Sequence, residues 1–282
     1  MVVSPTLRED ADRIWPLLGR IPRNIGGCPP FGTVVIDIDV GLDGTPVLDN
    51  PVWAALTGPQ AGLALGEGRA RRFPADVSPL AGLPAGADDG AWRDMAELVG
   101  PGGVFLGAEV PLPPPPGWTV ELELPGVQLV AADAPSGPVA ARPPVGDAVR
   151  LGAADVPEIL DLVARTEPGP FAPRTVELGG YVGVRLGGAL VAMAGQRLRP
   201  PGWTEISAVC TVPELRGRGL AGWLTQTVAA DVRACGDRPF LHALATNTGA
   251  VRLYQALGFA LRREVTFCAV RAPGVAPGAP TS

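Results

Sequence analysis

The spacing of apolar residues in the second half of the chain predicts a series of strands and helices. Residues 216–235 keep the four-residue spacing of one helix face, with apolar side chains at Leu220, Leu224, Val228 and Val232. Shorter apolar segments bounded by turn residues predict strands. We therefore expect helices at 155–165, 216–235 and 247–257, and strands at 147–151, 181–185, 189–198, 204–211, 240–245 and 265–270.

Capping and turn residues mark the ends of several of these elements. Asp155 and Glu158 stand three residues apart at the start of the first helix, which is the spacing of a capping box. The pair Gly187-Gly188 predicts a tight turn between the two strands of a hairpin. Asn247 predicts the start of the last helix, and Gly258 predicts its end.

The first half of the chain shows a weaker mixture of the same patterns. We expect a helix at 89–99, a strand at 104–109 and one or two strands within 118–131. Nearer the N-terminus, residues 6–18 suit a helix and residues 32–40 alternate as a half-buried strand does. The fold class is therefore α/β with a mixed sheet.

Segments rich in proline and glycine predict the domain organisation. Residues 111–117 form a stiff connector inside the first half, and 133–146 is the best candidate for a linker between domains. The predicted division is an N-terminal extension at 1–46, an α/β lobe at 47–132, the linker at 133–146, a second α/β domain at 147–271 and a loose tail at 272–282.

The charge composition excludes several kinds of chemistry. All 23 basic residues are arginine, so the chain has no lysine for a Walker A loop, a Schiff base or a kinase site. The net charge of −5 argues against a nucleic-acid partner. The longest apolar runs are too short to cross a bilayer and no secretory signal pattern begins the chain, so we expect a cytoplasmic protein without a membrane partner.

The cysteine and histidine content predicts no metal site. His242 is the only histidine, and no two cysteines form a CxxC pair. We expect reduced cysteines in the core, at Cys28, Cys210, Cys235 and Cys268.

A glycine-rich segment opens the helix predicted at 216–235. It reads Arg216-Gly217-Arg218-Gly219-Leu220-Ala221. Glycines at a helix start leave backbone N–H groups uncovered, and the helix end carries about half a positive charge. These two properties predict a phosphate-binding site.

The same segment also matches the dinucleotide fingerprint GxGxxG, at Gly217, Gly219 and Gly222. In a dinucleotide site the strand runs almost directly into the first glycine, and the next strand ends in an acidic residue. Here residues 212–216 intervene and the next strand ends at 245–247, without an acidic residue. The spacing therefore disfavours a Rossmann site.

Two motifs in the second half carry a resemblance to a known family. The first is R-x-x-G-x-A at Arg216, Gly219 and Ala221, and the second is N-x-x-A-x-x-x-Y-x-x-x-G-F at 247–259. In this order and spacing they resemble the GNAT N-acetyltransferase superfamily over residues 147–271. The whole chain is also similar to glycine N-acyltransferase-like proteins, in which a degenerate, non-catalytic half precedes the catalytic GNAT half.

The resemblance implies a sheet that splays open between the strands at 204–211 and 240–245, with acetyl-CoA as cosubstrate in the gap. Backbone groups of 209–211 would line the pantetheine and polarise the thioester, amides of 217–222 would hold the pyrophosphate, and Asn247 would touch the CoA arm. Arg218 would be an additional phosphate contact or, as an exposed arginine, a solvated side chain. The implied cofactor-binding positions are Val209, Cys210, Thr211, Arg216, Gly217, Arg218, Gly219, Leu220, Ala221, Gly222 and Asn247.

The resemblance also supplies catalytic candidates. Tyr254 matches the family's general acid, two helical turns after Asn247. For the base, Glu205 stands where the histone-acetyltransferase branch carries its glutamate, and His242 where the ribosomal-protein branch carries its base. A histidine titrates near neutral pH, whereas a glutamate needs burial to raise its proton affinity. His242, Glu205 and water remain three alternatives.

The implied function is an N-acetyltransferase that acts on a small-molecule or peptide amine. Longer-chain or amino-acid N-acyl transfer, and a non-catalytic CoA-binding regulatory module, are the alternatives. The 166–174 loop follows the first helix, where relatives shape the acceptor site, so Phe171 and Arg174 either contact the acceptor or fix the loop. A homodimer is a further expectation.

Overall fold

Eight strands form one mixed sheet in the part of the chain that the structure describes. The computed structural model describes residues 46–132 and 139–274, so the predicted helix at 6–18 and strand at 32–40 lie outside it. The strand order is β3-β10-β4-β9-β8-β7-β6-β5. In chain order the strands are β3 (Val104–Ala108), β4 (Thr119–Ala131), β5 (Asp147–Leu151), β6 (Tyr181–Leu186), β7 (Ala189–Gln196), β8 (Trp203–Thr211), β9 (Arg238–Leu244) and β10 (Phe259–Arg271).

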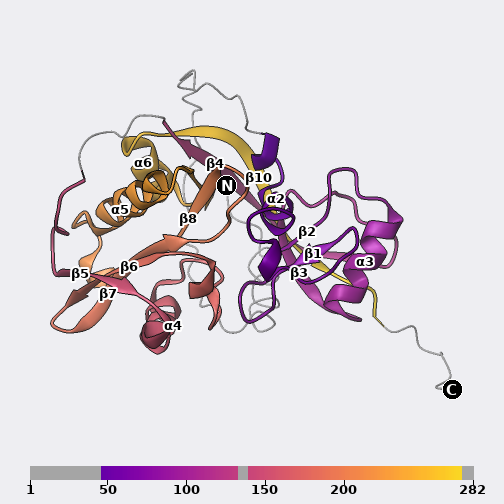
Figure 1. Ribbon diagram of the computed structural model, residues 1–282, viewed down its shortest axis with the longest axis horizontal. Helices are drawn as coiled ribbons and strands as arrows, with labels where there is room; N and C mark the ends of the chain where they lie inside the picture. Colours follow the sequence, from indigo (N-terminus) through magenta and orange to yellow (C-terminus); the bar gives the residue numbers. More distant parts are fainter. Residues whose placement is uncertain (1–45, 133–138, 275–282) are drawn as a thin grey trace, which may run out of the picture.

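Helices cover both faces of the sheet. Figure 1 shows α5 and α6 on one face and α4 on the other. A small two-stranded sheet and two further helices belong to the first half. The bounds are α2 (Pro51–Leu56), β1 (Arg71–Arg72), β2 (Ala81–Gly82), α3 (Asp89–Val99), α4 (Val156–Thr166), α5 (Leu220–Ala234) and α6 (Thr248–Ala256), with short 3-10 turns at η2 (Pro46–Leu48), η3 (Ala61–Leu63), η4 (Ala153–Asp155), η5 (Thr175–Leu178) and η6 (Pro213–Leu215).

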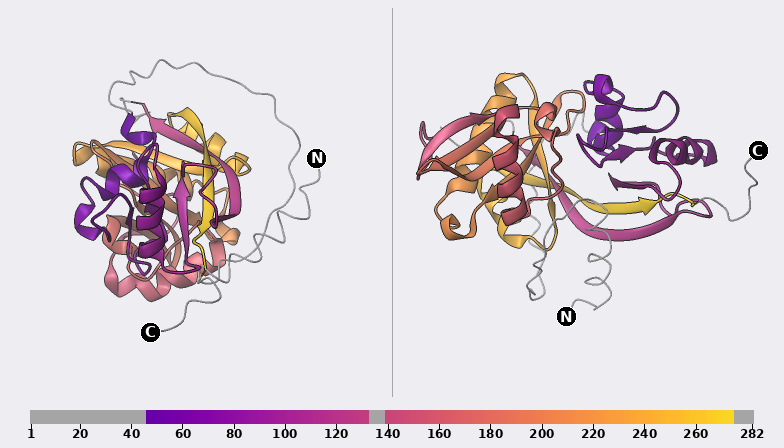
Figure 2. Two further views of the ribbon diagram at one scale, coloured as in Figure 1. Left: turned by 90° about the vertical axis from the view of Figure 1, so that its right-hand side faces the viewer. Right: turned by 90° about the horizontal axis from the view of Figure 1, so that it is seen from below.

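The two longest strands join the halves of the molecule. β4 comes from the first half, yet it lies between β9 and β10 of the second half and pairs antiparallel with both. The β4–β10 pair runs from one lobe into the other, where β3 and α3 pack (Figure 2). The predicted boundary at 132 therefore does not separate two sheets, and the division into domains stays a prediction.

Three hydrophobic clusters follow this arrangement. The largest packs α4 and α5 against the sheet, around Ile159, Met193 and Leu224. A second joins the first half to the sheet, where Leu48 and Leu56 pack with Phe240. A third fills the small lobe beneath α3, with Trp92, Phe105 and Trp118 in edge or tilted ring contacts.

The sheet opens between β8 and β9, which pair parallel, whereas the other neighbouring strands described in this sheet pair antiparallel. Their register pairs Trp203 with Arg238 and ends at Ile206 with Leu241, although β8 continues to Thr211 and β9 to Leu244. On its other edge β8 bulges, because Ala208 has a φ of 54° and the register with β7 shifts there. The predicted parting of these two strands is therefore confirmed.

Two predicted helix starts are wrong in detail. The helix expected from Arg216 begins at Leu220, because Gly217 and Gly219 take positive φ values of 75° and 81°. The predicted capping box of Asp155 with Glu158 does not form. Asp155 Oδ2 instead accepts from the amide of Gly152 at 2.9 Å, while Glu158 accepts from the amide of Leu190 on β7. Glu158 thus has a tertiary partner in place of the local one, while Asp155 caps the preceding turn η4.

No helix among the described residues is long and apolar enough to cross a membrane.

Candidate active site

The glycine-rich segment forms an exposed turn in front of α5. After η6, Arg216 is extended, and the positive φ of Gly217 and Gly219 turns the chain into the helix. A Cβ added at Gly217 would meet no atom within 4 Å, so conformation rather than space requires glycine there. The amide of Trp223 donates to the carbonyl of Gly219 at 3.0 Å. The amides of 220–222 therefore precede the first helical bond and face away from the helix.

The end of β8 supplies the next part of the site. Beyond the bulge at Ala208, Cys210 and Thr211 pair with β7 only, since β9 has already parted. The Thr211 Oγ1 atom is buried and has no hydrogen-bond partner within the described residues. Burial raises the pKa of the Cys210 thiol to about 11, so this thiol is neutral at physiological pH and is a weak nucleophile.

Tyr254 lies on α6, facing the core. Its side chain is buried and its ring lies 6.2 Å from that of Phe259. Burial, with the neighbouring Cys210, raises the pKa of Tyr254 to about 12, so the phenol keeps its proton at neutral pH. Asn247 caps the same helix, where its Oδ1 accepts from the amide of Ala250 at 3.2 Å. The structure thus places a neutral proton donor beside the free part of β8.

Glu205 and His242, the two alternative bases, form one hydrogen-bonded pair. His242 Nδ1 lies 2.8 Å from Glu205 Oε1, and the side chains are 3% and 0% exposed. Glu205 on β8 pairs in register with Phe240 on β9. Residue 242 lies two residues after Phe240, so its side chain is on the same face of the sheet and meets that of Glu205. The pair therefore sits where the two strands separate.

Arg197 binds the same carboxylate. Its Nε and Nη2 donate to the two Glu205 oxygens at 2.8 and 2.7 Å, a bidentate geometry. Burial alone would raise the pKa of Glu205, but the charge and hydrogen bonds of Arg197, together with His242, hold it far below its ordinary value. Glu205 is therefore a buried group that is ionised at neutral pH.

Tyr181 on β6 is a polar residue of this region that the sequence analysis missed. Its hydroxyl is buried and has no hydrogen-bond partner in the described chain. Its ring lies across Gly195, where a Cβ would come within 2.2 Å of the ring. Burial raises the pKa of Tyr181, and the charges of Arg197 and Glu205 reach it. An isolated glycine within a predicted strand indicates such a close approach, so Gly195 was the available signal.

The loop after α4 touches this face through one aromatic residue. Phe171 packs edge-on against Tyr181, with ring centroids 5.6 Å apart. Arg174 instead pairs with Glu177 at 2.7 Å and with Asp76 of the first half at 3.2 Å. Of the two roles open for Arg174, fixing the loop is the one these contacts support.

Within residues 46–132 and 139–274, no cluster of three or more histidine, cysteine or acidic side chains is placed to hold a metal ion.

Comparison with known proteins identifies relatives of this fold. The family model described as FR47-like protein matches residues 181–268, which span β6 to β10. A solved structure of a GNAT-family protein from Novosphingobium aromaticivorans is 42% identical, with a TM-score of 0.69, over 79% of this chain and 97% of that one. A GCN5-related N-acetyltransferase from Kribbella flavida is 20% identical, with a TM-score of 0.52, over 80% and 96% of the two chains, and shares the fold. No curated protein matches the chain.

An exposed glycine turn precedes α5, and two parting strands and the neutral Tyr254 lie beside it. The chain belongs to the GNAT family of acetyltransferases, as its 42% identity with the Novosphingobium protein over most of both chains shows.

Proposed function

We propose that this protein is an N-acetyltransferase that transfers the acetyl group of acetyl-CoA to a primary amine by direct attack in a ternary complex. One observation carries the proposal: the uncovered amides at the start of α5 lie next to the strands that part after Ile206 and Leu241. The acceptor is a small molecule or a peptide with a free amine.

The residues present fit acetyl-CoA. The amides of 217–222 suit a pyrophosphate, because those of 220–222 precede the first intrahelical hydrogen bond and the positive end of the α5 dipole lies there. Arg216 and Arg218 are exposed beside them. Residues 209–211 and Asn247 flank the gap between β8 and β9. The buried Thr211 Oγ1 has no hydrogen-bond partner within the described residues, so a bound ligand would supply one. Bound acetyl-CoA supplies an acetyl group activated as a thioester.

Substitution of Gly219 tests the proposed pyrophosphate site at residues 217–222. We expect Gly219→Ala to raise the KM for acetyl-CoA about tenfold, because a Cβ disfavours the left-handed conformation by about 1–2 kcal/mol and displaces the amides. Steady-state kinetics with varied acetyl-CoA measures this effect. Gly236→Ala is the matched control, since Gly236 has a φ of 85° at the other end of α5. An equal rise in KM for both variants would refute the assignment.

The side chains support direct transfer rather than an acyl-enzyme. Cys210 is close enough to Tyr254 to affect its pKa, and its neutral thiol does not suit nucleophilic attack. Tyr254 holds a proton at neutral pH and is the group we assign to protonate the departing thiolate. We assign the acid role to Tyr254 alone.

Water is the base that the geometry favours. Glu205 is held ionised by Arg197, and a carboxylate with such a low proton affinity is a poor acceptor for an ammonium proton. Both ring nitrogens of His242 already have partners, Glu205 and Gln128. We therefore propose that the amine loses its proton to water, with Glu205 and His242 shaping the acceptor side of the gap.

Product analysis tests the proposed function. We expect purified protein mixed with acetyl-CoA and a panel of amines to yield acetylated amine and free CoA, detected by mass spectrometry and a thiol reagent. Faster turnover with longer acyl-CoAs would favour the longer-chain alternative. Binding of acetyl-CoA without turnover of any amine would favour a regulatory module. Absence of binding at millimolar acetyl-CoA would refute the proposal.

A further inference from the structure

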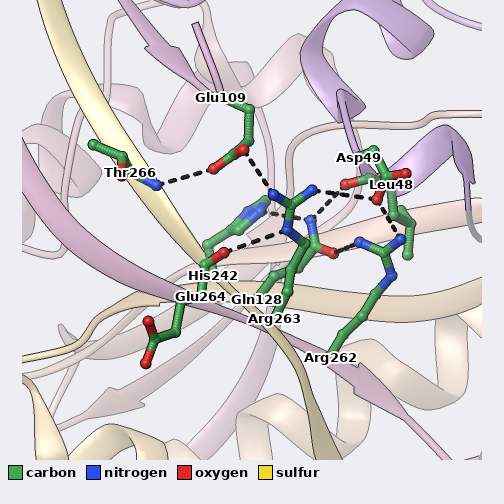
Figure 3. Close-up of polar contacts among 9 residues, drawn as sticks. All are labelled: Leu48, Asp49, Glu109, Gln128, His242, Arg262, Arg263, Glu264 and Thr266. Atoms are coloured by element: carbon green, nitrogen blue, oxygen red, sulfur yellow. Dashed lines mark hydrogen bonds and ion pairs between the residues drawn. The ribbon is translucent and has the colours of Figure 1, made fainter. Parts of the chain in front are cut away.

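A chain of polar contacts runs from His242 to the beginning of the described residues (Figure 3). His242 Nε2 lies 3.0 Å from Nε2 of Gln128, which stands opposite it on β4. Gln128 in turn contacts the backbone of Leu48 and the side chain of Arg262. Arg262 pairs with Asp49. Gln128 is 1% exposed, so its own contacts are shielded from solvent, whereas Asp49 at the end of this chain of contacts is 54% exposed.

The partners of Gln128 fix the orientation of its amide. Its Oε1 accepts from Nη1 of Arg262 at 2.8 Å, and its Nε2 donates to the carbonyl of Leu48 at 2.9 Å. An arginine only donates and a carbonyl only accepts. The reversed amide would place oxygen against oxygen at Leu48 and N–H against N–H at Arg262. The group that faces His242 is therefore an N–H donor.

This orientation decides which ring nitrogen of His242 carries the proton. Facing a donor, Nε2 must present its lone pair, and Nδ1 must then carry the hydrogen that is donated to Glu205 Oε1 at 2.8 Å. We propose that Gln128 is a positioning residue of the active site, which holds His242 as the neutral imidazole with Nδ1–H donated to Glu205. The residue comes from the half of the chain predicted to be non-catalytic.

The surroundings of His242 agree with a neutral ring. On the β8 side the facing charges are Glu205 and, behind it, Arg197, which neutralise each other. On the β4 and β10 side Arg262 and Arg263 both pair with Asp49, and Arg263 also pairs with Glu109, so two carboxylates balance two guanidinium groups. The aromatic rings of Phe240 and Phe267 meet the imidazole edge-on, at 5.6 and 5.8 Å. An imidazolium would add an uncompensated buried charge.

The consequence for catalysis rests on the proposed function. Attack by an amine on the thioester creates positive charge on the nitrogen at the acceptor side of the gap. A neutral His242 leaves that charge unopposed, whereas an imidazolium would repel it. Gln128 thus contributes to turnover without touching the reacting atoms.

The single histidine makes this inference directly observable. In protein labelled with ¹⁵N, the two ring nitrogens give one pair of signals whose shifts separate the two neutral tautomers and the cation. At neutral pH we expect a protonated Nδ1 and a bare Nε2 in the wild type. A protonated Nε2 in that spectrum would overturn the proposal, whether or not any variant folds.

Gln128→Glu is the decisive variant. Its carboxylate faces Nε2 with a hydrogen-bond acceptor, so the ring is expected to carry a hydrogen on both nitrogens, and the ¹⁵N spectrum at neutral pH should show the cation. The kcat/KM for the amine should then fall about tenfold relative to the wild type, because the imidazolium opposes the cationic nitrogen of the attacking amine.

Gln60→Glu is the matched control. Gln60 is also buried in the contact between the halves, at 5% exposure, where it binds the backbone of Arg197 and Arg199 instead of His242. Its imidazole signals should match the wild type. Equal shifts in both variants, or none in Gln128→Glu, would refute the proposal. Inactive wild-type protein with the expected imidazole spectrum would refute the proposed function and support this inference.

Discussion

Replacing Tyr254 by phenylalanine is expected to lower kcat by about 10²–10⁴, the usual contribution of acid catalysis, with the KM for acetyl-CoA nearly unchanged. The variant keeps the aromatic ring, which packs 6.2 Å from Phe259. It loses only the hydroxyl, whose pKa of about 12 keeps it protonated throughout the physiological range. Steady-state kinetics with varied acetyl-CoA and amine measures both constants.

Two observations separate loss of the acid from loss of the fold. Calorimetric titration of Tyr254→Phe with CoA should give the wild-type affinity, and its thermal unfolding midpoint should stay close to that of the wild type. Because the wild-type hydroxyl deprotonates only near pH 12, its titration should not reduce kcat at lower pH. Unchanged turnover in the variant would remove Tyr254 from the mechanism.

The second large effect is expected on stability, from Glu205→Gln. The variant leaves the guanidinium of Arg197 buried without its counter-charge, and breaking such a pair typically costs about 3–5 kcal/mol of unfolding free energy. Urea denaturation near pH 7 measures the loss. Since folding lowers the pKa of Glu205 from 4.5, the stabilisation is fully present above about pH 4.5 and is lost as the pH falls below it. The difference between wild type and variant should shrink accordingly in acid.

Glu177→Gln provides the matched control for this prediction. Glu177 also accepts a bidentate arginine, Arg174, but both side chains are more than 40% exposed. Solvent screening limits such a pair to about 0–1 kcal/mol. The double variant Arg197→Met with Glu205→Leu should recover most of the lost stability, because it removes both buried charges. A loss in Glu205→Gln no larger than in Glu177→Gln would show that the buried pair is not what stabilises the sheet.

The sequence by itself determined the elements that depend on local patterns. The helix at 89–99, the hairpin around Gly187-Gly188 and the cap at Asn247 are confirmed, because short-range periodicity and capping set them. The glycine-rich segment was recognised from its residues, but its turn was not predicted, because the positive φ of Gly217 and Gly219 moves the helix start from Arg216 to Leu220. These features, together with the Asn247–Phe259 motif, led to the GNAT family, which the comparison with the Novosphingobium protein shows.

The contacts between residues far apart in sequence were decided by the tertiary structure. β4 enters the sheet between β9 and β10, and no local pattern specifies a strand's distant neighbours. Glu205 and His242 were alternatives in the sequence, and only strand register made them partners 37 residues apart. Gln128 reaches His242 across 114 residues. Propensity and capping act within a few residues, whereas pairing and buried charge depend on which segments the fold brings together.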